Sequence, residues 1–426
     1  MKKQIYISIA IVVFIAFQLS GQQIEKSYAG TFLLKGGKLE TVYKGVIDAD
    51  VLIEDGLIKE VADDISHPGA QLIDCKGLII YPGMIDSGTK LGLAEISAVS
   101  LTQDHNEIGE YTPHMEALTA VNPNSVNIPV TRVNGVTTVL SVPSGGMMPG
   151  QAALINLQGY TPEQMYAGFK GVVLNFPSTG KRGRWDRRSD EDIKKADEKA
   201  KKNLKKYWDN AKIHAQMAAK GETKYNPQYQ ALAPAVNKEA PLLIRVNKKS
   251  DILAALNWVN ENDVKAIFTG VAEGYRVADS LAKYKIPVIT GPILDNPSRA
   301  SDKYDSAYAN AGIMQKAGVM VAIQTNETEN VRNLPYNAGF AAAYGMGWRE
   351  AFKAVTVNPA EMFGIADKYG TIERGKVANV FITDGDPFET KTMVKHLFIN
   401  GYKVPLESRH TLLYDEFLDR DPGLSK

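Results

Sequence analysis

Short apolar runs separated by turn residues dominate both ends of the chain. Near the N-terminus they read TFLLKGG, ADVLIEDGLIKEVA and AQLIDCKGLII, with a turn signal at Asp55-Gly56. The same pattern returns near the C-terminus in GTIERGKVANVFITDGDPF and VKHLFINGYKV. Such runs are typical of short strands joined by tight turns. We therefore expect residues 23–80 and 368–426 to form one small composite β-sandwich domain.

Between the two ends, short apolar runs alternate with helical patterns. After the run PLLIRV, for example, Ile252, Leu256 and Val259 share one face of an expected helix. This alternation over residues 81–367 predicts the α/β class and a parallel, TIM-like (β/α)8 barrel. A doubly wound open sheet is the competing architecture, because periodicity does not show whether a sheet closes. The expected strands read GVTTVLSVP, GVVLNF, PLLIRV, KAIFTG, PVITG and VMVAIQT.

A strongly charged segment, residues 181–220, interrupts this alternation. Its charges alternate in sign, and Ser189 and Asp192 have the spacing of a helix cap and capping box. These features predict a solvated helix inserted over the face of the barrel. The alternative is a lid that contacts a ligand through its arginines, Arg182, Arg184 and Arg187.

Residues 1–22 have the composition of a secretory signal peptide. Lys2 and Lys3 precede the apolar run IYISIAIVVFIAF, and small residues follow it. Because the run is shorter than the ~20 residues of a membrane-spanning helix, we expect cleavage and export to the periplasm or the outside of the cell, with no membrane attachment afterwards. Cys75 is the only cysteine, so no internal disulfide is expected.

The charge balance limits the class of partner. The 426 residues carry a formal net charge of +1, which gives no electrostatic reason to expect nucleic acid as a partner. A small-molecule ligand fits this balance better.

The stretch YPGMIDSGTKLGL, residues 81–93, has the form of a metal-binding strand end without its ligands. Alternate residues of a strand point to the same side, so a His-x-His pair there presents two imidazoles to one metal ion. The stretch resembles the first-strand signature of the amidohydrolase superfamily, metal-dependent hydrolases of carbon–nitrogen bonds, and especially its imidazolonepropionase-like members. Gly88 and Lys90 stand where that signature has its two histidines.

Further blocks extend the resemblance over most of the chain, among them IPVTRVNGVTTVLSVPSGG, LPYNAGFAAAYGM and AVTVNPAEMFGI. The resemblance implies a (β/α)8 barrel with a composite β-sandwich and a site for zinc or another divalent metal. The family's third and fourth histidine ligands fall on Arg245 and Gly270, and its catalytic aspartate falls on Asn326. Lys170 lies near the lysine that some members carbamylate to bridge two metals.

These replacements change the chemistry of the site. Protonated Lys90 and Arg245 are donors only and cannot ligate a metal. Each would also repel a divalent ion, because one pair of unit charges 4 Å apart interacts by about 4 kcal/mol at an effective dielectric of 20. We therefore expect no metal cofactor, and predict that Lys90, Arg245, Asn326 and Asp86 bind a small, anionic ligand. In the alternative, Lys90 and Arg245 form structural salt bridges with Asp86 and Glu273.

Two other routes to activity follow from the residue types. Asp104, His105, Glu107 and His114 are chemically adequate metal ligands, although their spacing is irregular. The candidate catalytic residues, neither of them strongly indicated, are Lys170 and Glu273.

Three hypotheses about function remain. The first is a secreted pseudoenzyme of the amidohydrolase family that binds a small ligand, or pairs with an active relative or with itself. The second is an active amidohydrolase that uses a rebuilt site on cyclic amides or dipeptide-like substrates. The third is a structural subunit without a ligand.

Overall fold

The computed structural model describes residues 26–178, 180, 186–418 and 420. The predicted signal peptide, Arg182 and Arg184 lie outside these residues. In the part of the chain that is described, no helix has both the length and the apolar character needed to cross a membrane.

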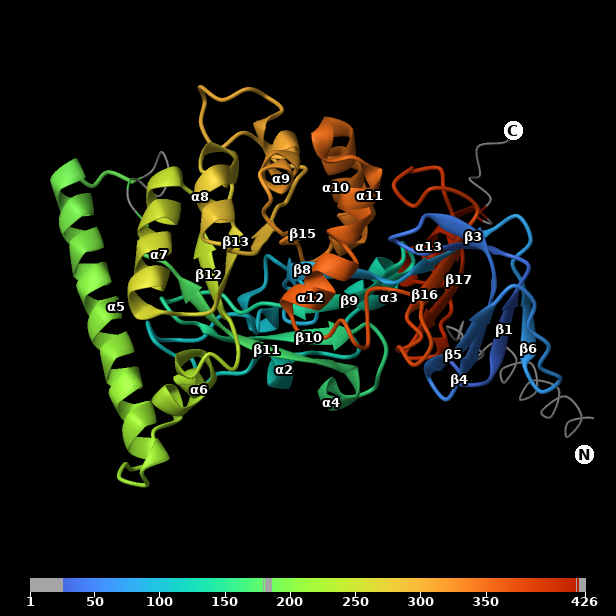
Figure 1. Cartoon of the computed structure of the whole chain (residues 1–426), viewed down its shortest axis with the longest axis horizontal. Coiled ribbons are helices and arrows are strands. Elements are labelled where there is room, and N and C mark those ends of the chain that lie inside the picture. The colour runs from blue at the N-terminus through green and yellow to red at the C-terminus, as the bar shows by residue number, and fades with distance from the viewer. Residues whose placement is uncertain (1–25, 179, 181–185, 419, 421–426) are drawn as a thin grey trace, which may run out of the picture.

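An eight-stranded sheet forms the centre of the molecule (Figure 1). Its edges meet after the strands end: the Asn326 amide donates to the Gly88 carbonyl and the Lys90 amide donates to the Glu327 carbonyl, both at 2.9 Å. The sheet is therefore a nearly closed barrel, and the predicted α/β barrel is confirmed. The strand order is β15 (Val321–Ile323), β14 (Val288–Thr290), β13 (Ala266–Gly270), β12 (Leu242–Val246), β11 (Tyr166–Asn175), β10 (Gly150–Asn156), β9 (Val136–Ser141) and β8 (Met84–Thr89).

One strand departs from the expected parallel arrangement. β10 pairs antiparallel with both β9 and β11, whereas the other neighbouring strands of the barrel pair in parallel. No strand was predicted here, because AALI is too short an apolar run to be distinguished from a loop or a helix by its periodicity. The glycine-rich stretch PSGGMMPGQ forms the connection from β9 into β10.

Helices cover the outside of the barrel (Figure 1). Their apolar faces pack on the outward residues of the strands, while inward residues such as Ile85, Leu243, Ile267 and Ile289 fill the interior. The helices are α2 (Ala117–Ala120), α3 (Asn127–Arg132), α4 (Pro162–Met165), α7 (Lys249–Asn262), α8 (Ala278–Lys283), α9 (Ser306–Lys316), α10 (Leu334–Ala341), α11 (Trp348–Lys353) and α12 (Val357–Met362), with short 3-10 turns at Ser100–Thr102, Gly274–Arg276 and Val331–Asn333 and a π turn at Ala342–Met346.

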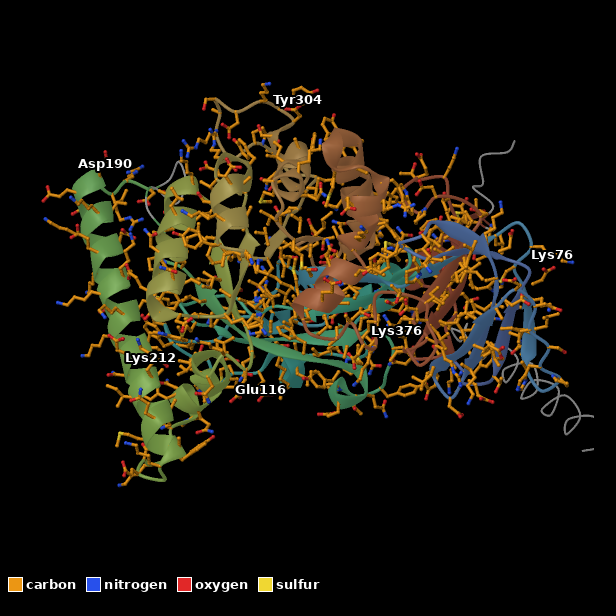
Figure 2. All side chains as sticks on the ribbon, viewed as in Figure 1. Lys76, Glu116, Asp190, Lys212, Tyr304 and Lys376 are labelled. Carbon is orange, nitrogen blue, oxygen red and sulfur yellow. The ribbon has the colours of Figure 1, made fainter. Side chains whose placement is uncertain are left out.

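The charged segment forms the long helix α5 (Asp190–Ala219), followed by α6 (Pro227–Val236). α5 lies at the edge of the molecule, and Figure 2 marks Asp190 and Lys212 along it. The Ser189 hydroxyl accepts the Asp192 amide at 3.1 Å, so the predicted cap is confirmed. Leu204 and Trp208 are buried on its inner face.

Strands from both ends of the chain share one sheet at the other side of the molecule (Figure 1). β16 (Val380–Thr383) pairs antiparallel with β7 (Ile79–Pro82), as a composite domain requires. The remaining strands of this sheet are β18 (Tyr402–Lys403), β17 (Val394–Ile399), β2 (Lys38–Glu40) and β3 (Val46–Asp48), and a second sheet holds β5 (Leu57–Ala62), β4 (Asp50–Glu54), β1 (Phe32–Lys35) and β6 (Gln71–Asp74). A last helix, α13 (Arg409–Leu418), follows them.

Candidate functional site

The site lies where the parallel strands end, and strand alternation places its side chains. Leu243 fills the barrel interior, so Arg245, two residues further along β12, also faces inward at the mouth. Arg245 lines three cavities at once, of about 30, 390 and 510 Å³. Asn326 lines the two smaller ones and Gly88 the smallest. The structure thus brings together three of the positions where the resemblance places metal ligands.

Lys90 and Arg245 give this mouth a positive potential. Burial lowers the pKa of Lys90, and the neighbouring Arg245 charge lowers it further, against a weaker opposing effect of Glu327. Burial also lowers the pKa of Arg245, although its side chain is open to the cavities. His105 faces the same field: burial, then the charge of Lys90, lower its pKa. Within the described residues, neither Lys90 nor Arg245 forms a salt bridge or side-chain hydrogen bond.

The alternative of structural salt bridges to Asp86 and Glu273 is therefore wrong for the described chain. Glu273 pairs with Arg299, whose Nη2 donates at 2.7 Å, and also accepts the Lys249 amide at 2.8 Å. Burial raises the pKa of Glu273, but the Arg299 and Lys249 hydrogen bonds and the Arg299 charge lower it overall. The Glu273 carboxylate therefore connects two loops through these hydrogen bonds. Because its oxygens are already bonded, it is poorly placed to act as a catalytic base.

Asp86 is fully buried, and its oxygens are already engaged. It accepts the Thr325 hydroxyl at 2.6 Å and the backbone amides of Gly88 and Thr325 at 3.0 and 3.1 Å. Burial raises its pKa to about 7, although these hydrogen bonds oppose the shift. These hydrogen bonds fix the end of β8. Direct contact of the Asp86 side chain with a ligand stays a prediction.

Lys170 lies apart from this cluster. Its ammonium pairs with Glu116 at 2.5 Å, and it lines a different cavity of about 900 Å³ together with Pro241 and Pro287, which precede β12 and β14. That cavity is at the opposite end of the barrel from Arg245. The structure therefore does not bring the candidate catalytic Lys170 to the mouth.

Amide side chains fill the space beside Gly88 and Gly270, two positions where the resemblance places metal ligands. A Cβ added at Gly88 would stand 2.2 Å from Oε1 of Gln324, whose Nε2 donates to the Gly291 carbonyl at 3.1 Å. A Cβ at Gly270 would stand 2.4 Å from Oδ1 of Asn247, and φ of Gly270 is +85°. Amides occupy the volume that imidazoles would need. With two cations also present, the residues do not fit a divalent ion.

The rebuilt metal site proposed from Asp104, His105, Glu107 and His114 is not formed either. Among the described residues, no three His, Cys, Asp or Glu side chains converge in a way that holds a metal ion. Nδ1 of His105 and Nδ1 of His114 are each buried without a hydrogen-bond partner in the described structure.

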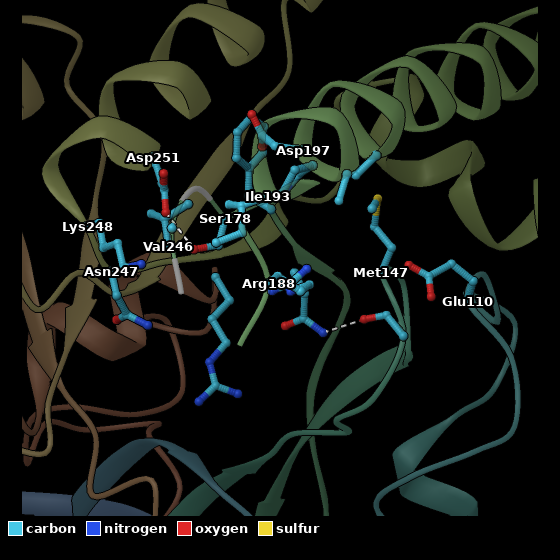
Figure 3. A pocket seen from close by; sticks show the side chains of 18 residues that line it. Glu110, Met147, Ser178, Arg188, Ile193, Asp197, Val246, Asn247, Lys248 and Asp251 are labelled. Carbon is cyan, nitrogen blue, oxygen red and sulfur yellow. Dashed lines mark hydrogen bonds between the residues drawn. The ribbon is translucent and has the colours of Figure 1, made fainter. Parts of the chain in front are cut away.

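The largest of the three cavities at Arg245 opens toward α5 (Figure 3). Ile193 and Asp197 reach it from that helix, Asn247 and Lys248 from the loop after β12, and Met147 from the connection into β10. The predicted insertion therefore does bound a cavity beside the site. Arg187, the described one of the three predicted lid arginines, is exposed and is not among the residues that line this cavity.

Sequence reasoning missed the amides and hydroxyls of the mouth. Ser87, Gln324 and Asn247 carry no family signature, and attention went to the charged positions. Strand alternation did hold a signal, because Ser87 follows the inward Ile85 by two residues and Gln324 follows the inward Ala322 by two.

Comparisons with known proteins agree with this fold. Residues 268–404 match the profile of the Amidohydrolase family. The chain is 21% identical over 388 residues to Amidohydrolase tasK of Hapsidospora irregularis, covering 83% of this chain and 39% of that protein. It is 33% identical over 110 residues to the imidazolonepropionase of Thermoplasma volcanium, covering 23% of this chain and 26% of that protein. The chain thus spans less than two fifths of the length of these curated relatives.

A solved structure matches over almost the whole fold. The crystal structure of an amidohydrolase from Thermotoga maritima superposes with a TM-score of 0.77 at 25% identity, covering 88% of this chain and 99% of that one. The barrel, the matched domain and these relatives agree with the strand-end signature of residues 81–93. Residues 268–404 thus match an Amidohydrolase-family domain, and the chain shares its fold with a solved amidohydrolase.

Proposed function

We propose that this chain is an exported amidohydrolase-family protein that has given up the metal chemistry of its barrel and binds a small anionic ligand at the mouth. The single observation that carries the proposal is the pair of unpaired cations, Lys90 and Arg245, at positions that resemble metal-ligand positions. Two neighbouring positive charges, on the half-buried Lys90 and on Arg245 beside the cavities, repel each other and oppose folding. An anionic ligand offsets that cost, which gives a physical reason for binding.

The replaced ligand set supports the loss of metal-dependent hydrolysis. A metal-activated water needs lone-pair ligands around an open coordination position. Gln324 and Asn247 fill that space, and the candidate base Glu273 is bound to Arg299. Export rests on residues 1–22 and is tested separately, by N-terminal sequencing of the protein recovered from a fractionated host.

The experiment begins with protein purified without a metal-affinity tag. Elemental analysis should find zinc, iron and manganese well below one atom per chain. Thermal-shift and calorimetric titrations with acetate, hexanoate and gluconate should then detect binding that Arg245→Ala and Lys90→Ala each weaken about tenfold, the usual size of a charge-assisted contact. Arg420→Ala and Lys195→Ala, which remove exposed charges paired on helix surfaces, are the matched controls.

Three results would overturn the proposal. Stoichiometric metal in the purified protein would restore the metal-dependent hypothesis. Chelator-sensitive turnover of a lactam or dipeptide would identify an active amidohydrolase. The absence of binding by every carboxylate would remove the ligand-binding role and leave either a pseudoenzyme that pairs with an active relative or with itself, or a structural subunit without a ligand.

A further inference from the structure

A buried hydroxyl without a partner in the described structure belongs to Ser87, which lines the smallest of the cavities at Arg245. Ser87 on β8 is 1% exposed, and its Oγ has no hydrogen-bond partner in the described structure. Because Ile85 fills the barrel interior, Ser87 also faces inward by strand alternation. Native folds rarely leave a buried hydroxyl unsatisfied, so such a group calls for an explanation. The surrounding cavity supports one such explanation, namely that the Ser87 hydroxyl binds a ligand.

The neighbouring strand shows the ordinary behaviour of a buried serine. Ser141 on β9 is fully buried, and its hydroxyl donates to the Leu91 carbonyl at 2.8 Å. The barrel can therefore satisfy a serine at this level from its own backbone. At Ser87 it does not do so.

The cavity that Ser87 lines has the chemistry of an anion site. It is shared by Arg245, Thr269 and Gln324, with Asn175 and Asn326 at its rim, and no Asp or Glu is among the described residues that line it. The Arg245 guanidinium and the hydroxyls of Ser87 and Thr269 supply hydrogen-bond donors. The amide nitrogens of Gln324 and Asn175 already donate to backbone carbonyls. Leu140, Val173 and Leu243 close the remaining walls, so a group bound here is largely shielded from water.

The volume limits the shape of that group. About 30 Å³ is room for on the order of two water-sized atoms. Two carboxylate oxygens fit this space, and the planar fork of a guanidinium matches a carboxylate edge. A phosphate has further oxygens out of that plane, which this cavity cannot hold without displacing Gln324 or Thr269.

The adjoining space indicates what the rest of the molecule looks like. The cavity of about 390 Å³ on the other side of Arg245 is lined by Asn247, Asn296, Ser298 and Asn326, and its described lining contains no aromatic side chain. Asp295 also lines it, with Oδ1 accepting the Asn296 amide at 2.7 Å. Amides and a hydroxyl suit an uncharged polar tail, and a carboxylate there disfavours a second negative charge.

We propose that Ser87 is a ligand-binding residue, donating to a planar carboxylate that Arg245 holds, and that the ligand is a monocarboxylic acid with a hydroxylated or amide-bearing tail. This inference rests on the proposed function and narrows it. Ser87 sets the depth of the site, while Arg245 supplies its charge.

The test compares Ser87→Ala with Ser141→Ala, using gluconate as the probe. Ser87→Ala should weaken gluconate binding about tenfold, the cost of a lost charge-assisted hydrogen bond, without lowering the melting temperature of the free protein. Ser141→Ala should do the reverse, lowering the melting temperature and leaving the dissociation constant of gluconate unchanged.

Probe selectivity on the unaltered protein gives a readout that requires no variant. Gluconate should bind more tightly than hexanoate, which has an apolar tail, and at least tenfold more tightly than sorbitol, which has no charge, or glucose 6-phosphate, which has a tetrahedral head. Equal gluconate affinity of Ser87→Ala and the unaltered protein, or tighter binding of the phosphate, would overturn the inference. If Arg245→Ala still weakened gluconate binding about tenfold in that case, the anion site would stand and only the role of Ser87 would be refuted.

Discussion

The Thr325 hydroxyl donates to Oδ2 of Asp86 at 2.6 Å, across the line where the first and last strands of the barrel meet. Asp86 lies within β8 and Thr325 two residues beyond β15. Both side chains are buried. A side-chain hydrogen bond therefore helps to close the barrel immediately beside the ligand site.

Removing the hydroxyl should weaken that closure. Thr325→Val leaves the buried Asp86 carboxyl with fewer donors, so we expect the free energy of unfolding to fall by about 2 kcal/mol. Urea denaturation measures the loss. Thr131→Val is the control, because Thr131 is buried and its hydroxyl has no partner in the described structure; an equal loss in both variants would contradict the role of the hydrogen bond.

The same carboxyl predicts a pH dependence of stability. Burial raises the pKa of Asp86 to about 7, above its usual 3.8. The folded protein thus binds this proton more tightly than the unfolded chain, and the contribution is complete below about pH 4 and lost as the pH rises through 7. Unfolding free energies measured between pH 5 and 8 should fall less in Asp86→Asn than in the unaltered protein. Parallel curves for the two proteins would refute the assignment.

A side chain at position 88 should conflict with Gln324. Gly88→Ala places a Cβ 2.2 Å from Oε1 of Gln324, so we expect a loss of about 1–3 kcal/mol from overpacking. Gln324→Ala should relieve most of that loss in the double variant, giving a coupling energy above about 0.5 kcal/mol in a double-mutant cycle. Strictly additive losses would show that Gln324 does not fill the former ligand position.

Breaking the Glu273–Arg299 pair should destabilise the fold without affecting the mouth. Arg299→Ala leaves Glu273, with 2% of its side chain exposed, without its main partner, so the free energy of unfolding should fall. Solvent around the exposed Arg299 keeps this loss below that of a fully buried pair. The pKa of Glu273 is lowered in the folded protein, from its usual value of 4.5. The difference in the free energy of unfolding between the unaltered protein and Arg299→Ala should therefore shrink as the pH falls below about 4.5.

The affinity for gluconate distinguishes a structural role of the Glu273–Arg299 pair from a catalytic or ligand-binding role. It should be unchanged in Arg299→Ala and in Glu273→Gln. A large loss of affinity in Glu273→Gln would place Glu273 in the ligand site.

Lys170 offers a contrasting prediction on a partly exposed pair. The side chains of Lys170 and Glu116 are 30% and 38% exposed, so breaking the pair should cost less than about 1 kcal/mol. Lys170→Ala should also leave gluconate binding intact, since the residue lies at the other end of the barrel. If that variant lost ligand binding or a hydrolytic activity, the original candidate role of Lys170 would return.

Local patterns were sufficient to predict the barrel strands and the Ser189 cap, because each depends on residues close together in the chain, whereas closure of the barrel was implied only by the family resemblance. Buried strands such as β12 appear as apolar runs, and a cap needs only Ser189 and Asp192. The family resemblance, at residues 81–93 for Lys90 and at the end of β12 for Arg245, also placed these two cations in one site, and in the structure each lies within the electrostatic reach of the other.

Contacts between distant segments could not be read in the same way. Nothing local indicates that Gln324 fills the space beside Gly88, or that Glu273 selects Arg299 over Lys90 and Arg245. Both outcomes depend on three-dimensional packing and on which charge is nearest after folding. Lys170 was misplaced for a related reason, since a match of residue type does not fix which end of the barrel a side chain reaches.

The reversed direction of β10 changes how the rim of the barrel can diversify. In an all-parallel barrel, every strand delivers its own loop to the rim, and each loop varies independently. In this barrel, β9 and β10 share one short connection at the rim, so this part of the rim has one loop where an all-parallel barrel has two. Variation in ligand preference on that side therefore falls to the segment after β11, the one that carries α5.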